Sequence, residues 1–200
     1  MKQKDLKYLF KNLKNGDSIG FYSKPFYLIF ARLIFWATRI KLSHVAGIFD
    51  VKRRGSILSF SVGEQTISHK GKTAERYTMV NSLNGILIDS RFRDTKNIFY
   101  YMPLKFRISK EQNKILKEYW NTKEDYAFEE LAYTVNWFFK IFGKKNKVYD
   151  GNCSTACRQA MILAGIKADN DDKAPTPAEF SRFSYIKDII EIGEAINGSA

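Results

Sequence analysis

The first half of the chain carries short apolar segments of the kind that form β-strands. The segment 43–51 is rich in strand-forming residues, and the turn 52–55 leads to a second such segment at 56–62, which predicts a β-hairpin. Further strands are expected at 17–23, 85–90 and 97–104. Two helices are expected in the same half: an N-terminal helix over 2–15, which ends at Asn15-Gly16, and an aromatic helix over 26–39.

From residue 109 onwards the apolar positions recur at helical spacing. Ser109 and Gln112 form a capping box ahead of the first of these helices. A second helix is expected over 128–142 and a third over 152–165, and Thr176-Pro177 opens a short one. A last strand is expected within 185–192. Because strands come first and helices follow, the pattern predicts an α+β fold, with residues 1–200 in a single domain.

The composition narrows the classes of partner. The chain has 200 residues, with 33 Lys and Arg against 21 Asp and Glu, a net charge of +12. This excess favours anionic partners, but the basic residues are scattered and no nucleic-acid motif is present, so no specific nucleic-acid partner is predicted. With two cysteines, a structural zinc site and a disulfide framework are both excluded. No cofactor and no metal are expected.

The chain has one segment with some membrane character. Residues 25–38 are mostly apolar, but they are too few to span a bilayer and Arg32 interrupts them. No signal peptide is recognised at the N-terminus, so a cytoplasmic protein is expected, with the option of peripheral contact with an anionic membrane surface. The aromatic helix over 26–39 is expected to be buried in the domain, and docking on a bilayer is the alternative.

The third predicted helix carries the most informative residue, Cys153. Six residues at helical spacing form one face of this helix: Cys153, Ala156, Cys157, Ala160, Met161 and Ala164. Cys153 lies at the helix start, where free backbone N–H groups and the helix dipole favour a thiolate. Cys157 is one turn further in and is expected to be structural. Two ordinary buried cysteines are the alternative, and no disulfide between them is expected.

A nucleophilic cysteine needs a base and a group that orients the base. The two histidines are His44, in a predicted strand, and His69, in a polar stretch where a solvated loop residue is the alternative interpretation. The candidate orienting groups on the strand after His44 and beyond it are Ser59, Ser61, Glu64 and His69. Glu64 is the only carboxylate among them, and a solvated turn residue after Gly63 is its alternative interpretation.

Five short motifs, in this order, resemble one known family. They are Gly16-Asp17-Ser18-Ile19, Ser43-His44-Val45-Ala46-Gly47-Ile48, Asn152-Cys153-Ser154, Ala164-Gly165-Ile166 and Thr176-Pro177-Ala178-Glu179-Phe180. Together they resemble the circularly permuted NlpC-type papain-like proteins of the YiiX and YebB branch, in which the histidine precedes the cysteine. The resemblance covers residues 16–183 and implies an antiparallel sheet packed against a central helix that carries the cysteine. Residues 1–15 and 184–200 would flank this core as an N-terminal helix and a C-terminal strand and tail.

The resemblance also implies roles for individual residues. Cys153 would be the nucleophile, His44 the base, and a third polar residue would lie on the strand after the histidine. Simple counting places Ser59 there, where relatives more usually have Glu or His, so Ser59, Glu64 and a backbone carbonyl all remain candidates. The related lecithin:retinol acyltransferase-like proteins share the Asn-Cys motif seen at Asn152-Cys153, and they move acyl groups on lipids.

These observations predict a cysteine hydrolase that acts as an amidase or peptidase through Cys153, His44 and Glu64 and forms an acyl-enzyme. The expected substrate contains an amide or ester bond, as in a peptide, a cell-wall fragment or a lipid. A lipid acyl hydrolase or acyltransferase at a membrane surface is one alternative. A non-catalytic basic domain that binds anionic surfaces is the other.

Overall fold

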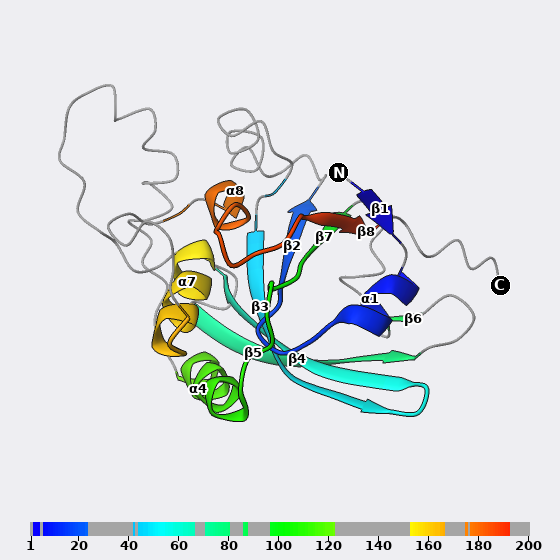
Figure 1. Ribbon diagram of the computed structural model, residues 1–200, viewed down its shortest axis with the longest axis horizontal. Coiled ribbons are helices and arrows are strands. Elements are labelled where there is room, and N and C mark those ends of the chain that lie inside the picture. Colours follow the sequence, from blue (N-terminus) through cyan, green and yellow to red (C-terminus); the bar gives the residue numbers. More distant parts are fainter. Residues whose placement is uncertain are drawn as a thin grey trace, which may run out of the picture.

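A computed structural model of the chain shows an α+β fold in which helices cover a curved sheet (Figure 1). The structure describes residues 2–4, 6–23, 42, 44–66, 71–80, 86–87, 97–122, 153–166, 175 and 177–192. The helices expected at 26–39 and 128–142, and the candidate His69, lie outside these residues.

The sheet contains eight strands. In chain order they are β1 (Lys2–Lys4), β2 (Ser18–Ser23), β3 (His44–Arg54), β4 (Ile57–Thr66), β5 (Gly71–Val80), β6 (Ile86–Leu87), β7 (Asn97–Met102) and β8 (Ile190–Ile192). Their spatial order is β1-β8-β7-β2-β3-β4-β5-β6. The β1–β8 pair is parallel, and every other neighbouring pair in this order is antiparallel.

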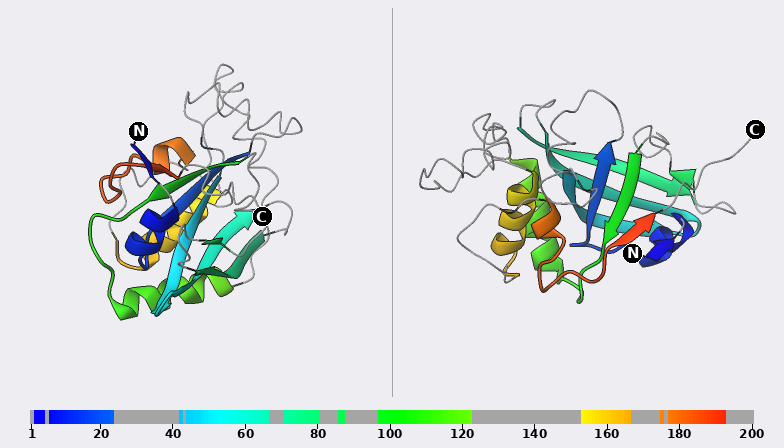
Figure 2. Two further views of the ribbon diagram at one scale, coloured as in Figure 1. Left: turned by 90° about the vertical axis from the view of Figure 1, so that its right-hand side faces the viewer. Right: turned by 90° about the horizontal axis from the view of Figure 1, so that it is seen from above.

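Four helices are described, and they lie on different sides of the sheet. They are α1 (Leu6–Asn12), α4 (Lys110–Asn121), α7 (Cys153–Leu163) and α8 (Pro177–Phe180). Figure 1 and the right-hand view of Figure 2 show α4 and α7 next to each other, away from α1. The capping box predicted for α4 is present, because Ser109 accepts from the Gln112 amide and Gln112 accepts from the Ser109 amide.

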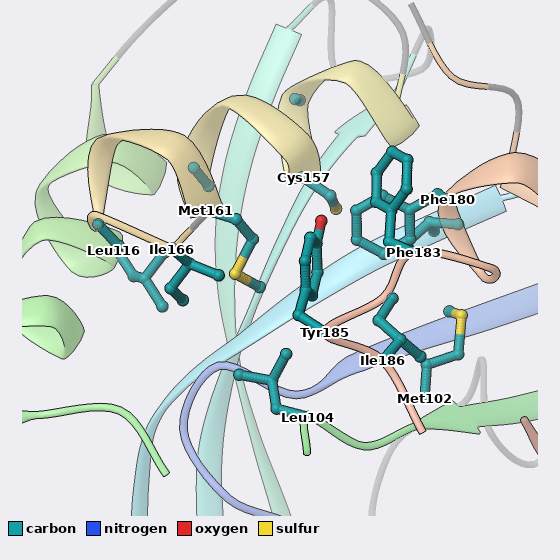
Figure 3. Close-up of a cluster of buried hydrophobic side chains, with 14 of the residues drawn as sticks. Met102, Leu104, Leu116, Cys157, Met161, Ile166, Phe180, Phe183, Tyr185 and Ile186 are labelled. Carbon is teal, nitrogen blue, oxygen red and sulfur yellow. The ribbon is translucent and has the colours of Figure 1, made fainter. Parts of the chain in front are cut away.

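Two apolar clusters form the core. One lies between the sheet and the helices α4, α7 and α8, and the other lies between the sheet and α1. Figure 3 shows the first cluster, in which Cys157 and Met161 of α7 lie near Phe180 and Tyr185 from the C-terminal part of the chain. The small residues predicted on the inner face of α7 are buried here, which lets this helix lie close to β3 and β4.

Trp120 fixes the position of α4 against the sheet. Its indole is almost fully buried and lies over Gly47 of β3 and Gly63 of β4. A Cβ atom at Gly63 would lie 2.2 Å from two ring carbons of Trp120, and one at Gly47 would lie 3.2 Å from its Nε1. The two glycines therefore provide the space that the indole occupies.

The start of β2 is held by the buried side chain of Asp17. Its carboxylate accepts hydrogen bonds from the backbone N–H groups of Lys14 (2.9 Å) and Leu104 (2.8 Å) and from the hydroxyl of Tyr101. Burial raises the pKa of Asp17 to about 6, although these hydrogen bonds and the charge of Lys14 oppose the shift. The motif Gly16-Asp17 thus ties the first helix to the sheet at the end of β7.

Several element boundaries differ from the sequence expectation. Lys2–Lys4 form strand β1 rather than helix, because they pair with Ile190–Ile192 at the far end of the chain. The last strand is likewise shorter than 185–192. Strand β4 continues to Thr66, and Gly71–Val80 form a strand that was not predicted. Strands β4 and β5 pair over their whole length, so the hydrogen bonds between them stabilise both strands.

Among the described residues, no helix has the length and apolar character needed to cross a bilayer.

Candidate active site

The first residues of β3 and α7 meet at one end of the sheet. His44 is the first residue of β3, and Cys153 is the first residue of α7, which packs against β3 and β4. The Cys153 and His44 side chains interact through a hydrogen bond and through their charges. The structure therefore brings together the two residues that the sequence singled out as nucleophile and base.

The start of α7 is anchored by its second residue. The buried hydroxyl of Ser154 donates a 2.6 Å hydrogen bond to the carbonyl oxygen of Pro175, just ahead of α8. On the inner side of the helix, Ala156, Cys157 and Ala160 are buried against the sheet. Because these side chains are small, Cys153 can lie close to the backbone of β3.

Glu64 completes the arrangement from β4. Its Oε2 atom lies 3.0 Å from His44 Nε2, and only 2% of the Glu64 side chain is exposed, against 23% for His44. With Nε2 engaged by Glu64, the other ring nitrogen, Nδ1, remains to interact with the thiol. The aromatic ring of Phe21 packs beside the imidazole, with 6.1 Å between ring centroids. Glu64 and Phe21 together hold the ring in one orientation.

The solvated-turn interpretation of Glu64 is wrong, because Glu64 lies within β4 and is buried. Simple counting along the strand placed Ser59 beside His44, but the structure places Ser59 elsewhere. The hydroxyl of Ser59 accepts a 3.0 Å hydrogen bond from Arg76, and Ser59 pairs with Lys52 near the distant end of the hairpin. Ser61 pairs with Phe49 and also lies further along the hairpin than Glu64. The carboxylate beside His44 is therefore Glu64.

The electrostatics of the site favour a thiolate–imidazolium pair. Burial alone would lower the pKa of His44, but the charges of and hydrogen bonds to Cys153 and Glu64 outweigh it and raise the pKa to about 10. Burial alone would raise the pKa of the Cys153 thiol, but the charge of and hydrogen bond to His44 lower it below the ordinary thiol value. A proton is thus transferred from sulfur to imidazole more readily than in an exposed pair.

Two backbone groups add to this effect, and sequence analysis did not find them. The backbone N–H groups of Val45 and Ser154 face the Cys153 sulfur closely enough to lower its pKa. Val45 follows the base and Ser154 follows the nucleophile, so each donor is the neighbour of a catalytic candidate. The only signal in the sequence was the helix start itself, where backbone N–H groups are free to donate.

Cys157 is in a different environment, although it lies one turn from Cys153. It is buried, and its pKa is raised well above the ordinary value by burial and by the nearby charges of Cys153 and Glu64. Both cysteines are free, which confirms the expectation that no disulfide joins them. Cys157 therefore remains a neutral thiol within the core.

The described residues contain no group of three or more His, Cys, Asp or Glu side chains arranged to hold a metal ion. The chemistry that the site can perform with its own side chains is nucleophilic attack by sulfur, assisted by an oriented imidazole. No protein-family model matches the sequence, and no curated protein is significantly similar to it.

Proposed function

We propose that this chain is a cysteine hydrolase that cleaves an amide bond through an acyl-enzyme. The observation that carries the proposal is the arrangement of Cys153, His44 and the buried carboxylate of Glu64. A purely structural role explains it poorly, because burying a carboxylate and a cation costs free energy that a core of apolar side chains would avoid. Perturbed titratable groups that cluster in this way are typical of catalytic sites.

In the proposed reaction the Cys153 thiolate attacks the substrate carbonyl carbon, and a carbon–sulfur bond forms. The imidazolium of His44 then donates its proton to the amide nitrogen as the carbon–nitrogen bond breaks, and the amine leaves. A water molecule next attacks the thioester while His44 accepts one of its protons. The carbon–sulfur bond then breaks with sulfur leaving as the thiolate, the acid is released, and the thiolate–imidazolium pair is restored. Throughout the cycle, Glu64 keeps the imidazole in position and stabilises its positive charge.

We further propose that the fold is a circularly permuted papain-like fold. Three features support this assignment: the antiparallel sheet, the cysteine-bearing helix packed on it, and a histidine strand that precedes the cysteine in the chain. The expected substrates of such an enzyme are peptides or cell-wall fragments. The same chemistry applied to an ester would act on lipids.

The test is turnover of matched amide and ester substrates. Peptidyl anilides, muramyl-peptide fragments and phospholipid vesicles would be offered to the wild-type chain, Cys153→Ala and Cys157→Ala. Hydrolysis of an amide by the wild type and by Cys157→Ala, but not by Cys153→Ala, is the expected result. If phospholipid esters were hydrolysed and amides were not, the substrate would be a lipid ester rather than an amide. Activity that survives in Cys153→Ala would refute the proposal.

A further inference from the structure

A cluster of five cations lies at the other end of β2 from the Cys153 site; one of them, Lys14, is half-buried and the other four are exposed. The five residues are Lys14, Arg53, Lys105, Arg107 and Lys187. Lys105 and Arg107 belong to the segment 104–107 that follows β7, and Lys14 contacts the backbone of this segment. Lys14 Nζ donates to the carbonyl oxygens of Leu104 (2.9 Å) and Phe106 (3.0 Å). This segment is held in place because Lys105 N–H donates to Tyr185 and Lys187 N–H donates to Pro103. We call these five residues the basic cluster.

The basic cluster is not neutralised within the described part of the chain. None of its members forms an ion pair with a carboxylate there, and Lys14 and Arg53 direct their charged groups at backbone carbonyls instead. The Asp17 carboxylate lies close to Lys14, but its oxygens accept hydrogen bonds from two backbone N–H groups and a tyrosine hydroxyl. Asp188 follows Lys187 and is exposed, but it is not ion-paired with the cluster.

The like charges are close enough to affect one another. Burial lowers the pKa of Lys14; Asp17 opposes the shift, and the charges of Lys187 and Arg107 add to it. Burial likewise lowers the pKa of Arg53, Tyr101 and Asp17 oppose this, and Arg107 adds to it. Several positive charges thus lie near one another, and an anionic partner would relieve their repulsion.

An exposed aromatic side chain belongs to the same segment as the basic cluster. Phe106 lies between Lys105 and Arg107 in the sequence and is 42% exposed. An exposed ring between cations is suited to a phospholipid surface, where the ring enters the acyl boundary and the cations contact the head groups. A nucleic acid would use the cations but would need stacking on unpaired bases to use the ring.

We propose that the basic cluster and Phe106 form a docking surface for an anionic phospholipid bilayer. This surface is independent of the proposed hydrolase activity, because it lies at the opposite end of β2. Ser18 of β2 pairs with Met102 next to the cluster, whereas Phe21 of the same strand pairs with His44. Docking would bring the enzyme to a membrane without placing the thiol in it.

The experiment is co-sedimentation with phosphatidylcholine vesicles that do or do not contain phosphatidylglycerol, at low and moderate salt. The variant K105Q/R107Q removes two cations of the cluster. The matched control K114Q/K117Q removes two exposed cations of α4 outside it. Both variants have the same net charge, so a difference in their vesicle binding would show that the position of the removed charges matters. Circular dichroism and the rate of Cys153 alkylation verify that each variant is folded.

The expected result is salt-sensitive binding to the anionic vesicles only. It should weaken roughly tenfold or more in K105Q/R107Q and much less in K114Q/K117Q. Phe106→Ala should also weaken binding, while the salt dependence is retained. Equal weakening in the two double variants would overturn the proposal, because binding would then follow net charge alone. Absence of vesicle binding, or preferential binding of single-stranded RNA, would overturn it as well.

Discussion

The Glu64 carboxylate lies 3.0 Å from Nε2 of His44, and the two residues are 20 positions apart on neighbouring strands. This contact joins a buried acid to a partly exposed imidazole whose other nitrogen remains for the Cys153 thiol. A carboxylate in this place fixes the orientation of the ring and stabilises the imidazolium. We therefore expect the contact between Glu64 and His44 to influence the reactivity of Cys153.

The first prediction concerns the charge of Glu64. Glu64→Gln retains a polar group of the same size but removes the negative charge, so the pKa of His44 should fall and less of Cys153 should be thiolate at neutral pH. We expect the rate of Cys153 alkylation by iodoacetamide at neutral pH to fall about tenfold or more. Glu179→Gln changes an exposed carboxylate on α8 and should leave the rate unaltered. Equal rates in all three proteins would contradict an orienting role for Glu64.

The second prediction concerns the pH dependence of Cys153 reactivity. Because the pKa of Cys153 is lowered and that of His44 is raised to about 10, the ion pair should exist between these two values. The alkylation rate of the wild type should therefore rise at a lower pH than that of an ordinary thiol. In His44→Ala, the rise should move up towards the ordinary thiol pKa of about 8.5. Identical profiles for the two proteins would show that His44 does not activate the thiol.

The third prediction separates the two cysteines. In the single-cysteine variants Cys157→Ala and Cys153→Ala, the remaining thiols should differ widely in reactivity near neutral pH. Cys153 is partly exposed with a lowered pKa, and Cys157 is buried with a raised one. Mass spectrometry of alkylated protein over time measures both rates. Similar rates would mean that the start of α7 does not distinguish the two positions.

The fourth prediction concerns the packing of the Trp120 indole against Gly47 and Gly63. A methyl group at Gly63 would overlap the indole, whereas one at Gly47 would only touch it, at 2.2 and 3.2 Å respectively. Gly63→Ala should therefore lower the free energy of unfolding by about 1–3 kcal/mol, and Gly47→Ala by less. Urea denaturation followed by tryptophan fluorescence measures both values. The reverse order would argue against the observed packing of α4 on β3 and β4.

Cys153 and His44 could be predicted because their signals are local. A helix start with small residues on one face points to Cys153, and only two histidines were available as the base. Glu64 could be named only as one candidate among several, because its position depends on the length of β4. Strand β4 reaches Thr66 by pairing with β5, and polar residues such as Lys72 and Glu75 obscure the alternation of β5 in the sequence.

Local sequence patterns also could not predict contacts between distant parts of the chain, because these contacts depend on which strands pair. Lys2–Lys4 look like the start of a helix, and only Ile190–Ile192, more than 180 residues later, make them a strand. The backbone donors Val45 and Ser154 at the sulfur depend on how α7 meets β3. Side-chain identity does not encode such backbone contacts, so a structure was needed to find them.

The most direct test of the proposed activity is to trap the acyl-enzyme. The wild type, Cys153→Ala, Cys157→Ala and His44→Ala would be mixed with p-nitrophenyl acetate, quenched in acid, and analysed by intact-protein and peptide mass spectrometry. We predict one acetyl group on Cys153 in the wild type and in Cys157→Ala, none in Cys153→Ala, and slower formation in His44→Ala. Acetylation that is absent from Cys153, or that forms equally fast without His44, would contradict the proposed nucleophile and base.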